Sequence, residues 1–148
     1  MKSTGIPFLL ATTSPRTPRA VLIVDDEPDI LDALSAVLTA SLDVDVVTAA
    51  SGPAALACLD GRTFDLVISD FRMPAMNGIE LLAQARIRQP CAHRLLLTAF
   101  PEPELARVAR DVAGVGILMT KPVRRADLLL RVQAVLAKTS PSQGDQTP

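Results

Sequence analysis

The sequence of 148 residues contains no tryptophan and no tyrosine, and phenylalanine occurs four times. It has one histidine, His93, and two cysteines, Cys58 and Cys91. These are too few for a zinc site built from four Cys and His ligands, and His93 is the only imidazole available to a catalytic triad. Two cysteines also form no disulfide framework, which favours a reducing, cytoplasmic location.

Other missing features exclude further classes of protein. No apolar run reaches the roughly 20 residues that a membrane span needs, and the GxxxxGK(S/T) motif that binds nucleotide phosphates is absent. The formal net charge is −1, without the basic excess typical of nucleic-acid binding. We therefore expect direct contact with neither a membrane nor nucleic acid.

Negative charge is concentrated in one stretch of the chain. Residues 20–60 carry eight acidic residues and no lysine or arginine, a net charge of −8. Residues 101–138, by contrast, have a net charge of +3. The near-neutral net charge therefore conceals an acidic segment in the first part of the chain. Its acidic residues are Asp25, Asp26, Glu27, Asp29, Asp32, Asp43, Asp45 and Asp60.

Between residues 20 and 138, short apolar runs alternate with segments of helical spacing. Five strands that alternate with five helices predict a single α/β domain with a doubly wound parallel sheet. The segments 1–19 and 139–148 are rich in Ser, Thr and Pro, and we expect them to be disordered tails. The predicted strands are the β-branched or leucine-rich runs at 21–24, 44–48, 66–69, 95–98 and 115–119.

Polar side chains follow four of these strands at the point where each strand ends. In open α/β sheets, binding sites lie at the carboxyl ends of the strands. If the first and third strands are neighbours, their three carboxylates share one pocket, close to a hydroxyl and an ammonium group. These residues are Asp25 and Asp26 after the first strand, Asp70 after the third, Thr98 at the end of the fourth and Lys121 after the fifth.

Three neighbouring carboxylates cannot all remain ionised without a cation. Because the site offers oxygen ligands and no His or Cys, the expected cation is Mg²⁺. The alternative is that the acids cap the first helix, since Asp26 precedes Pro28. Capping accounts for one or two acids there but leaves Asp70 and Lys121 unexplained, so we favour the metal.

The same residues carry a resemblance to a known family. Asp25-Asp26, Asp70, Thr98-Ala99 and Lys121-Pro122, each at a strand end, resemble the response regulator receiver domain of two-component signalling. The resemblance covers residues 20–138. It implies a flavodoxin-like (βα)5 fold with a five-stranded parallel sheet in the order 2-1-3-4-5.

The resemblance also implies a role for each residue. Asp70 would accept a phosphoryl group as a carboxylate nucleophile, from a sensor histidine kinase or a histidine phosphotransfer protein. Asp26, Asp70 and the backbone carbonyl of Arg72 would bind Mg²⁺, with Asp25 acting mainly through water. Lys121 would neutralise charge on the phosphoryl group.

Three further expectations come from the same resemblance. The Thr98 hydroxyl would bond a phosphoryl oxygen and move inward when phosphate arrives. The Lys121–Pro122 peptide bond would be cis. Gly78 would serve the turn into the third predicted helix.

The chain departs from the family at one position. Receivers commonly place Tyr or Phe three residues before the lysine, where the ring swings inward with the threonine; here that residue is Leu118. Phe100, two residues after Thr98, is a candidate to take over part of this switch. Phe100 and Arg72 also flank the acceptor, and a bulky pair there is expected to slow attack by water.

We expect the protein to pass its signal on through contacts with another protein. Only ten residues, 139–148, follow the last predicted helix, so we expect a stand-alone receiver rather than an enzyme. Its unknown downstream partner would contact the face of the fourth helix, fifth strand and fifth helix, and a phosphorylation-dependent dimer is left open. Two alternatives remain: an interaction module whose output ignores phosphate, and a Mg²⁺-dependent phosphohydrolase with an aspartate nucleophile.

Overall fold

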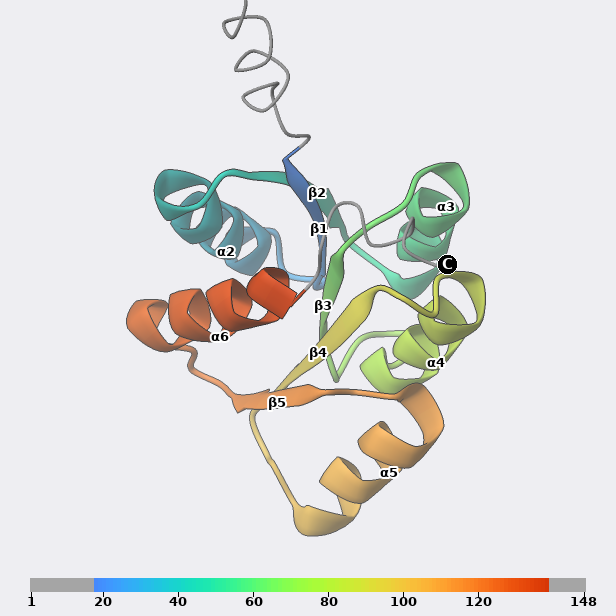
Figure 1. The fold of residues 1–148 in the computed structure, drawn as a ribbon. Coiled ribbons are helices and arrows are strands. Elements are labelled where there is room, and N and C mark those ends of the chain that lie inside the picture. Colours follow the sequence, from blue (N-terminus) through green and yellow to red (C-terminus); the bar gives the residue numbers. More distant parts are fainter. Residues whose placement is uncertain (1–17, 139–148) are drawn as a thin grey trace, which may run out of the picture.

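The computed structural model describes residues 18–138. The expected disordered tails therefore lie outside the described residues, except for residues 18 and 19 of the N-terminal one. Five strands alternate with five helices, as predicted (Figure 1). The elements are β1 (Arg19–Val24), α2 (Pro28–Ser41), β2 (Val44–Ala49), α3 (Gly52–Gly61), β3 (Leu66–Asp70), α4 (Gly78–Arg88), β4 (His93–Thr98), α5 (Pro103–Ala113), β5 (Ile117–Thr120) and α6 (Arg125–Lys138).

All five strands are parallel and lie in the order β2-β1-β3-β4-β5, which confirms the predicted flavodoxin-like fold. Because β1 pairs directly with β3, the end of β1 at Val24 lies opposite Ser69, the residue before Asp70. The register therefore brings the carboxyl ends of the two strands to one edge of the sheet.

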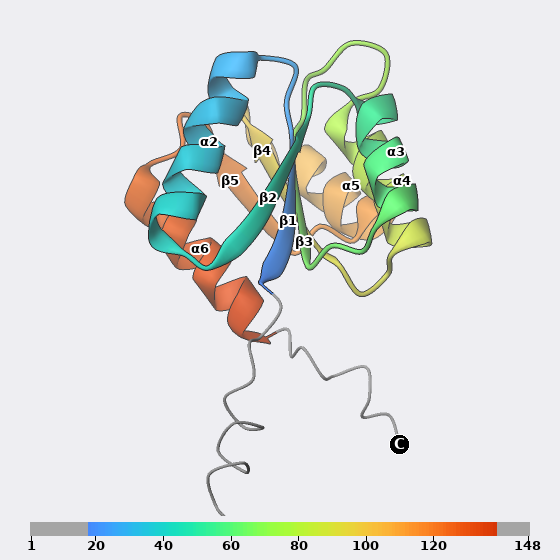
Figure 2. The ribbon, with the colours of Figure 1, turned by 90° about the horizontal axis from the view of Figure 1, so that it is seen from above.

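Helices cover both faces of the sheet. α2 and α6 pack on one face, and α3, α4 and α5 pack on the other (Figures 1 and 2). Successive strand residues point to opposite faces, so Val21 and Ile23 of β1 join the core under α2 and α6, whereas Leu22 and Val24 join the other core. The central strands β1, β3 and β4 are mostly buried, whereas the edge strands β2 and β5 are only partly buried.

Six of the ten strand boundaries differ from the prediction by one or two residues, and the starts of the first and last strands are the informative ones. β1 begins at Arg19, which the sequence assigned to the N-terminal tail; Arg19 pairs with Val44, and its Nη1 donates to the Leu136 carbonyl at 2.7 Å. β5 begins at Ile117 rather than at residue 115, because α5 ends in a left-handed Gly114 (φ 62°). Among residues 18–138, no helix is long and apolar enough to cross a membrane.

Helix starts follow the local sequence. Ser51 caps α3 by accepting a hydrogen bond from the Ala54 amide at 3.1 Å, with Pro53 in the first turn. At α4, Asn77 and Glu80 form a reciprocal capping box, with both hydrogen bonds at 2.9 Å. This box fixes the start of the helix that follows the loop after Asp70.

Candidate functional site

The predicted polar residues meet at the carboxyl edge of the sheet. Asp25, Asp70 and Thr98 are almost fully buried, with exposed fractions of 1%, 6% and 3%. Asp26 is exposed, yet one carboxylate oxygen each from Asp25, Asp26 and Asp70 lie within 4.8 Å of one another. Strand pairing thus brings together residues that are up to 45 positions apart in the chain, between Asp25 and Asp70.

Lys121 joins this cluster from the end of β5. Its Nζ lies 2.9 Å from Asp70 Oδ1 and 3.6 Å from Asp25 Oδ2, and its backbone amide donates to the Thr98 carbonyl at 2.8 Å. Burial lowers the pKa of Lys121, but the hydrogen bond and charge of Asp70 and the charge of Asp25 outweigh it, so the net pKa is raised. The ammonium group is therefore held in its charged form. The Lys121–Pro122 bond is cis, as predicted.

Asp25 has one satisfied and one unsatisfied oxygen. Its Oδ1 accepts a hydrogen bond from the Glu27 amide at 2.9 Å, whereas Oδ2 is buried without a hydrogen-bond partner. Burial raises the pKa of Asp25; the Glu27 amide opposes this shift and the nearby charge of Asp70 adds to it. A buried carboxylate oxygen without a donor is costly unless a cation or water satisfies it.

The donor set fits a hard cation. Three carboxylates face a single ammonium group, so the cluster lacks positive charge, and oxygen atoms are the ligands that Mg²⁺ prefers. Asp25 Oδ2, which has no hydrogen bond and is paired only with Lys121 at 3.6 Å, lies in the same cluster. The capping alternative accounts only for the Asp25 Oδ1 contact with Glu27 at the start of α2.

The loop after Asp70 is held closely against the strand. The Asp70 carbonyl accepts a hydrogen bond from the Ser69 hydroxyl at 2.9 Å, and the Gly78 amide donates to the Phe71 carbonyl at 2.8 Å. A Cβ at Gly78 would lie 2.3 Å from the Asp70 carbonyl oxygen. Gly78 lies at the start of α4, as expected, and it is required there because the Asp70 carbonyl leaves no room for a side chain. Within the loop, Ala75 adopts φ 70°, a strained conformation for a residue with a side chain.

The predicted switch residues occupy different environments. The Thr98 hydroxyl oxygen accepts a hydrogen bond from the Phe100 amide at 3.1 Å, and Phe100 is 63% exposed. The Arg72 guanidinium lies over the Phe100 ring, 5.8 Å from its centroid. Leu118 is half-buried and packs against the core under α3, α4 and α5. The Arg72 carbonyl as a metal ligand stays a prediction.

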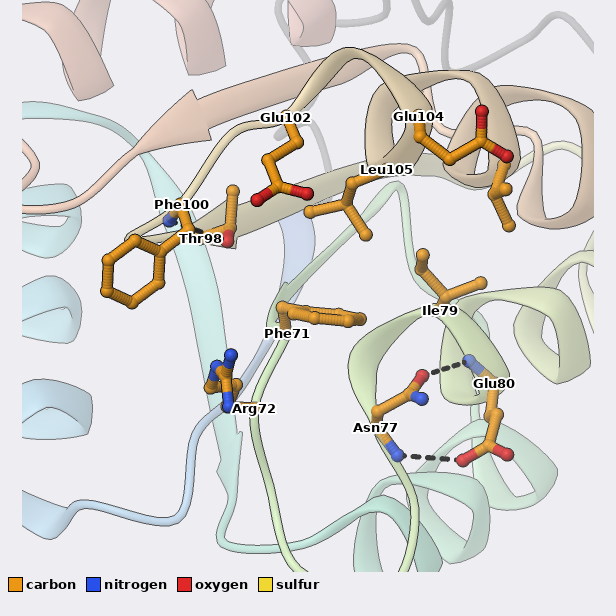
Figure 3. A pocket seen from close by; sticks show the side chains of 11 residues that line it. Phe71, Arg72, Asn77, Ile79, Glu80, Thr98, Phe100, Glu102, Glu104 and Leu105 are labelled. Carbon is orange, nitrogen blue, oxygen red and sulfur yellow. Dashed lines mark hydrogen bonds between the residues drawn. The ribbon is translucent and has the colours of Figure 1, made fainter.

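A cavity of about 440 Å³, which the sequence did not predict, adjoins this site (Figure 3). Its walls come from separate segments: the loop after β3, the end of β4, and helices α4 and α5. No local pattern could have indicated it, because the packing of α4 beside α5 creates it. Its lining includes Phe71, Ile79, Thr98, Phe100, Leu105 and Val108.

Comparison with known proteins agrees with this geometry. Residues 21–133 match the family model of the response regulator receiver domain. The chain belongs to the response regulator receiver family. Members are the receiver domains of two-component response regulators, which as a family bind Mg²⁺ at an acidic pocket and serve as phosphoacceptors in signalling. They work with histidine kinases or phosphotransfer proteins.

Individual relatives are similar over most of this receiver. The transcriptional regulatory protein GlrR of Escherichia coli K12 is 37% identical over 129 residues, covering 87% of this chain and 29% of its own length. The alkaline phosphatase synthesis regulator PhoP of Bacillus subtilis is 34% identical, covering 82% of this chain and 50% of its own. The chain thus spans between about a third and a half of these curated relatives.

Solved receiver structures cover the chain in the same way. The signal receiver domain of an HD domain-containing protein from Pseudomonas fluorescens Pf-5 superposes with a TM-score of 0.78 at 31% identity, covering 82% of this chain and 97% of that one. The chemotaxis response regulator CheY4 of Vibrio cholerae superposes with a TM-score of 0.74 at 34% identity, covering 80% of this chain and 99% of that one. These similarities place the whole receiver fold within the chain.

Proposed function

We propose that Asp70 accepts a phosphoryl group from the phosphohistidine of a sensor histidine kinase or a histidine phosphotransfer protein. The observation that carries this proposal is the buried Asp70 carboxylate, 2.9 Å from Lys121 Nζ and beside a second buried carboxylate with an unsatisfied oxygen. A carboxylate nucleophile and a fixed ammonium group are what transfer of a phosphoryl group to an aspartate needs, and the excess negative charge favours a cation in the same pocket.

In the transfer, a carboxylate oxygen of Asp70 attacks phosphorus, the phosphorus–nitrogen bond of phosphohistidine breaks, and the electron pair leaves with the imidazole. The product is an acyl phosphate. Negative charge on the phosphoryl oxygens lies within reach of Lys121, whose raised pKa keeps the ammonium charged. The Thr98 hydroxyl, at the neighbouring strand end, supplies a hydrogen-bond donor to a phosphoryl oxygen.

Asp25, Asp26 and Asp70, with the Arg72 carbonyl, are the groups that would hold Mg²⁺. The bound ion would supply positive charge that offsets the carboxylates and the incoming phosphoryl group. Asp25 contributes the unsatisfied Oδ2, and the Glu27 amide orients this carboxylate through Oδ1.

We propose that output passes through protein contacts of the face formed by α5, β5 and α6. Lys121 and Thr98 connect the acceptor to this face, since the Lys121 amide bonds the Thr98 carbonyl at the ends of β4 and β5. The face is mildly basic, with Arg107, Arg110 and Arg124 exposed, which favours an acidic partner.

Intact-mass analysis after incubation with acetyl phosphate and Mg²⁺ tests the acceptor. We expect one stable phosphoryl addition in the wild type and none in Asp70→Asn. Asp43→Asn, an exposed aspartate outside the cluster, is the matched control and should be modified like the wild type. Absence of an adduct would favour the phosphate-independent interaction module, and continuous release of phosphate would favour the phosphohydrolase.

A further inference from the structure

The cavity beside the acceptor is part of a longer groove on the surface. It shares Phe71, Arg72 and Asn77 with a second hollow of about 590 Å³, which the loop after β3 forms with Met73 and Pro74. The two hollows therefore make one continuous depression, from the start of α5 past the start of α4 to that loop, which we call the α4–α5 groove. Its length suits a segment of polypeptide better than a single small molecule.

The floor of the α4–α5 groove is apolar. Phe71, Leu105 and Val108 line it and pack against the core under α3, α4 and α5, yet all three are only partly buried. Met73 continues this surface into the second hollow. Apolar side chains that lie together and stay in contact with water mark sites where another molecule binds. The floor is therefore a surface that apolar side chains of a partner would cover.

The rim of the α4–α5 groove is acidic. Glu80 lies in the first turn of α4, and Glu102 comes directly before α5, on the other wall. The Glu102 carboxylate points toward Leu105 and the floor (Figure 3). Because a carboxylate there lies above apolar side chains, the groove is complementary to a Lys or Arg that stands next to an apolar residue.

Stabilisation of the helices explains only part of this rim. Glu80 completes the capping box of α4, and Glu104 pairs with Arg107 one turn along α5. Glu102 does not cap α5 through its side chain. Among the residues that the structure describes, its carboxylate has neither a hydrogen bond nor an ion pair. Glu102 is therefore the acidic group of the groove that is free to pair with a bound cation.

We infer that the α4–α5 groove binds a basic amphipathic segment of a partner protein, with apolar side chains on the floor and a Lys or Arg at Glu102. The groove is distinct from the α5–β5–α6 face, whose exposed arginines favour an acidic partner. Helix α5 thus borders two surfaces that select partners of opposite charge. The floor and rim are already formed without a phosphoryl group, so binding should not require phosphorylation of Asp70.

Selection from a displayed library of random peptides tests the chemistry of the occupant. With the immobilised full chain as target and no phosphoryl donor, we expect enriched peptides to carry apolar residues next to Lys or Arg. Binding of these peptides, labelled with fluorescein and followed by anisotropy, should weaken about tenfold in Glu102→Lys. Asp43→Lys, the same change of charge at an exposed position outside the groove, is the matched control and should bind like the wild type.

A second substitution tests the apolar floor. Leu105→Ala shortens a floor side chain without changing charge, so the peptides should bind severalfold more weakly at low and high salt alike. The effect of Glu102→Lys should shrink at high salt. Enrichment of acidic peptides, equal binding to Glu102→Lys and the wild type, or no enriched peptide at all would each overturn the inference. A wild-type dimer that Glu102→Lys dissociates would instead assign the groove to a second copy of this chain.

Discussion

The two edges of the sheet differ in how their polar groups are satisfied. At the carboxyl edge, Asp25 Oδ2 has no hydrogen-bond donor, Ala75 is in a left-handed conformation and Phe100 lies in solvent. At the amino edge, Gln89 and Asp65 close hydrogen bonds between elements. We therefore expect the hydrogen bonds at the amino edge to contribute most to stability, and the proposed chemistry to use the groups left unsatisfied at the carboxyl edge.

Gln89 illustrates the amino edge. Its Oε1 accepts from the Phe64 amide, and its Nε2 donates to the carbonyls of Leu59 and Arg62, all at 2.8 Å. One side chain therefore satisfies three backbone groups where α3 ends and the chain enters β3.

Arg94 has a similar role where α5 ends. Its guanidinium donates to the carbonyls of Gly114 at 3.2 Å and Ala92 at 2.7 Å. Asp65 Oδ2 accepts from the Ala20 amide at 2.8 Å and fastens the start of β1. Both charged side chains are thus held by backbone partners.

The largest effect on stability is expected at the amino edge. Gln89→Ala leaves the Phe64 amide and two carbonyls without their partner, so we expect a loss of about 3 kcal/mol in the free energy of unfolding. Urea unfolding measures it. Gln84→Ala, which removes a contact with Arg88 on the surface of α4, should change stability by less than about 0.5 kcal/mol. Phosphorylation of the folded fraction should be unchanged in both; its loss in Gln89→Ala would contradict the separation of the edges.

Gly78→Ala should affect both properties, because it acts on the acceptor strand. The new Cβ would lie 2.3 Å from the Asp70 carbonyl oxygen, and relieving this overlap is expected to cost about 2 kcal/mol. Since the Asp70 backbone must move, the rate of phosphorylation by acetyl phosphate should also fall. Gly61→Ala, whose Cβ would meet nothing within 4 Å, is the matched control. Equal rates for the two variants would show that the Gly78 contact does not position the acceptor.

Asp25→Asn, at the carboxyl edge, should raise the free energy of unfolding, whereas the two preceding substitutions lower it. Removing a buried charge beside Asp70 is expected to stabilise the metal-free protein by about 1 kcal/mol at neutral pH. The folded pKa of Asp25 is raised above 3.8, so the folded state binds the proton more tightly than the unfolded state. The destabilisation by Asp25 therefore appears as pH rises from 3.8 through the folded pKa.

Urea unfolding in a chelator, at pH 4 and pH 7, checks this dependence. The advantage of Asp25→Asn over the wild type should be larger at pH 7. The substitution should also weaken binding of Mg²⁺ measured by calorimetry. A variant that is less stable than the wild type at neutral pH would mean that Asp25 is a structural residue like Asp65.

The smallest effect concerns His93 at the amino edge. Burial lowers the pKa of His93, and the charges of Arg94 and Lys138 lower it further. The unfolded state then binds the proton more tightly, so the contribution of neutral His93 is present above pH 6.5 and is lost as pH falls through the folded pKa. His93→Gln should flatten the difference in stability between pH 7.5 and pH 5.5, measured by urea unfolding. If the difference in stability between the two pH values is the same in His93→Gln and the wild type, other groups cause it.

The sequence predicted the fold order and the site because their signals are local. An apolar run followed by Asp70 or Lys121 marks a strand end, and parallel pairing then brings those ends together. Gln89, the cavity beside Thr98 and the reason for Gly78 were not predictable, since each depends on elements that pack together from distant parts of the chain. Arg19 was misassigned for the same reason: its partners are Val44 and Leu136.

The central claim, that the carboxyl edge carries a phosphoaspartate, is tested most directly by chemical trapping. The protein is incubated with acetyl phosphate and Mg²⁺, reduced with borohydride, which converts an acyl phosphate of aspartate to homoserine, and digested for peptide sequencing by mass spectrometry. We predict homoserine at position 70 and nowhere else. Unmodified aspartate at position 70, or homoserine at Asp25 or Asp26 instead, would contradict the account.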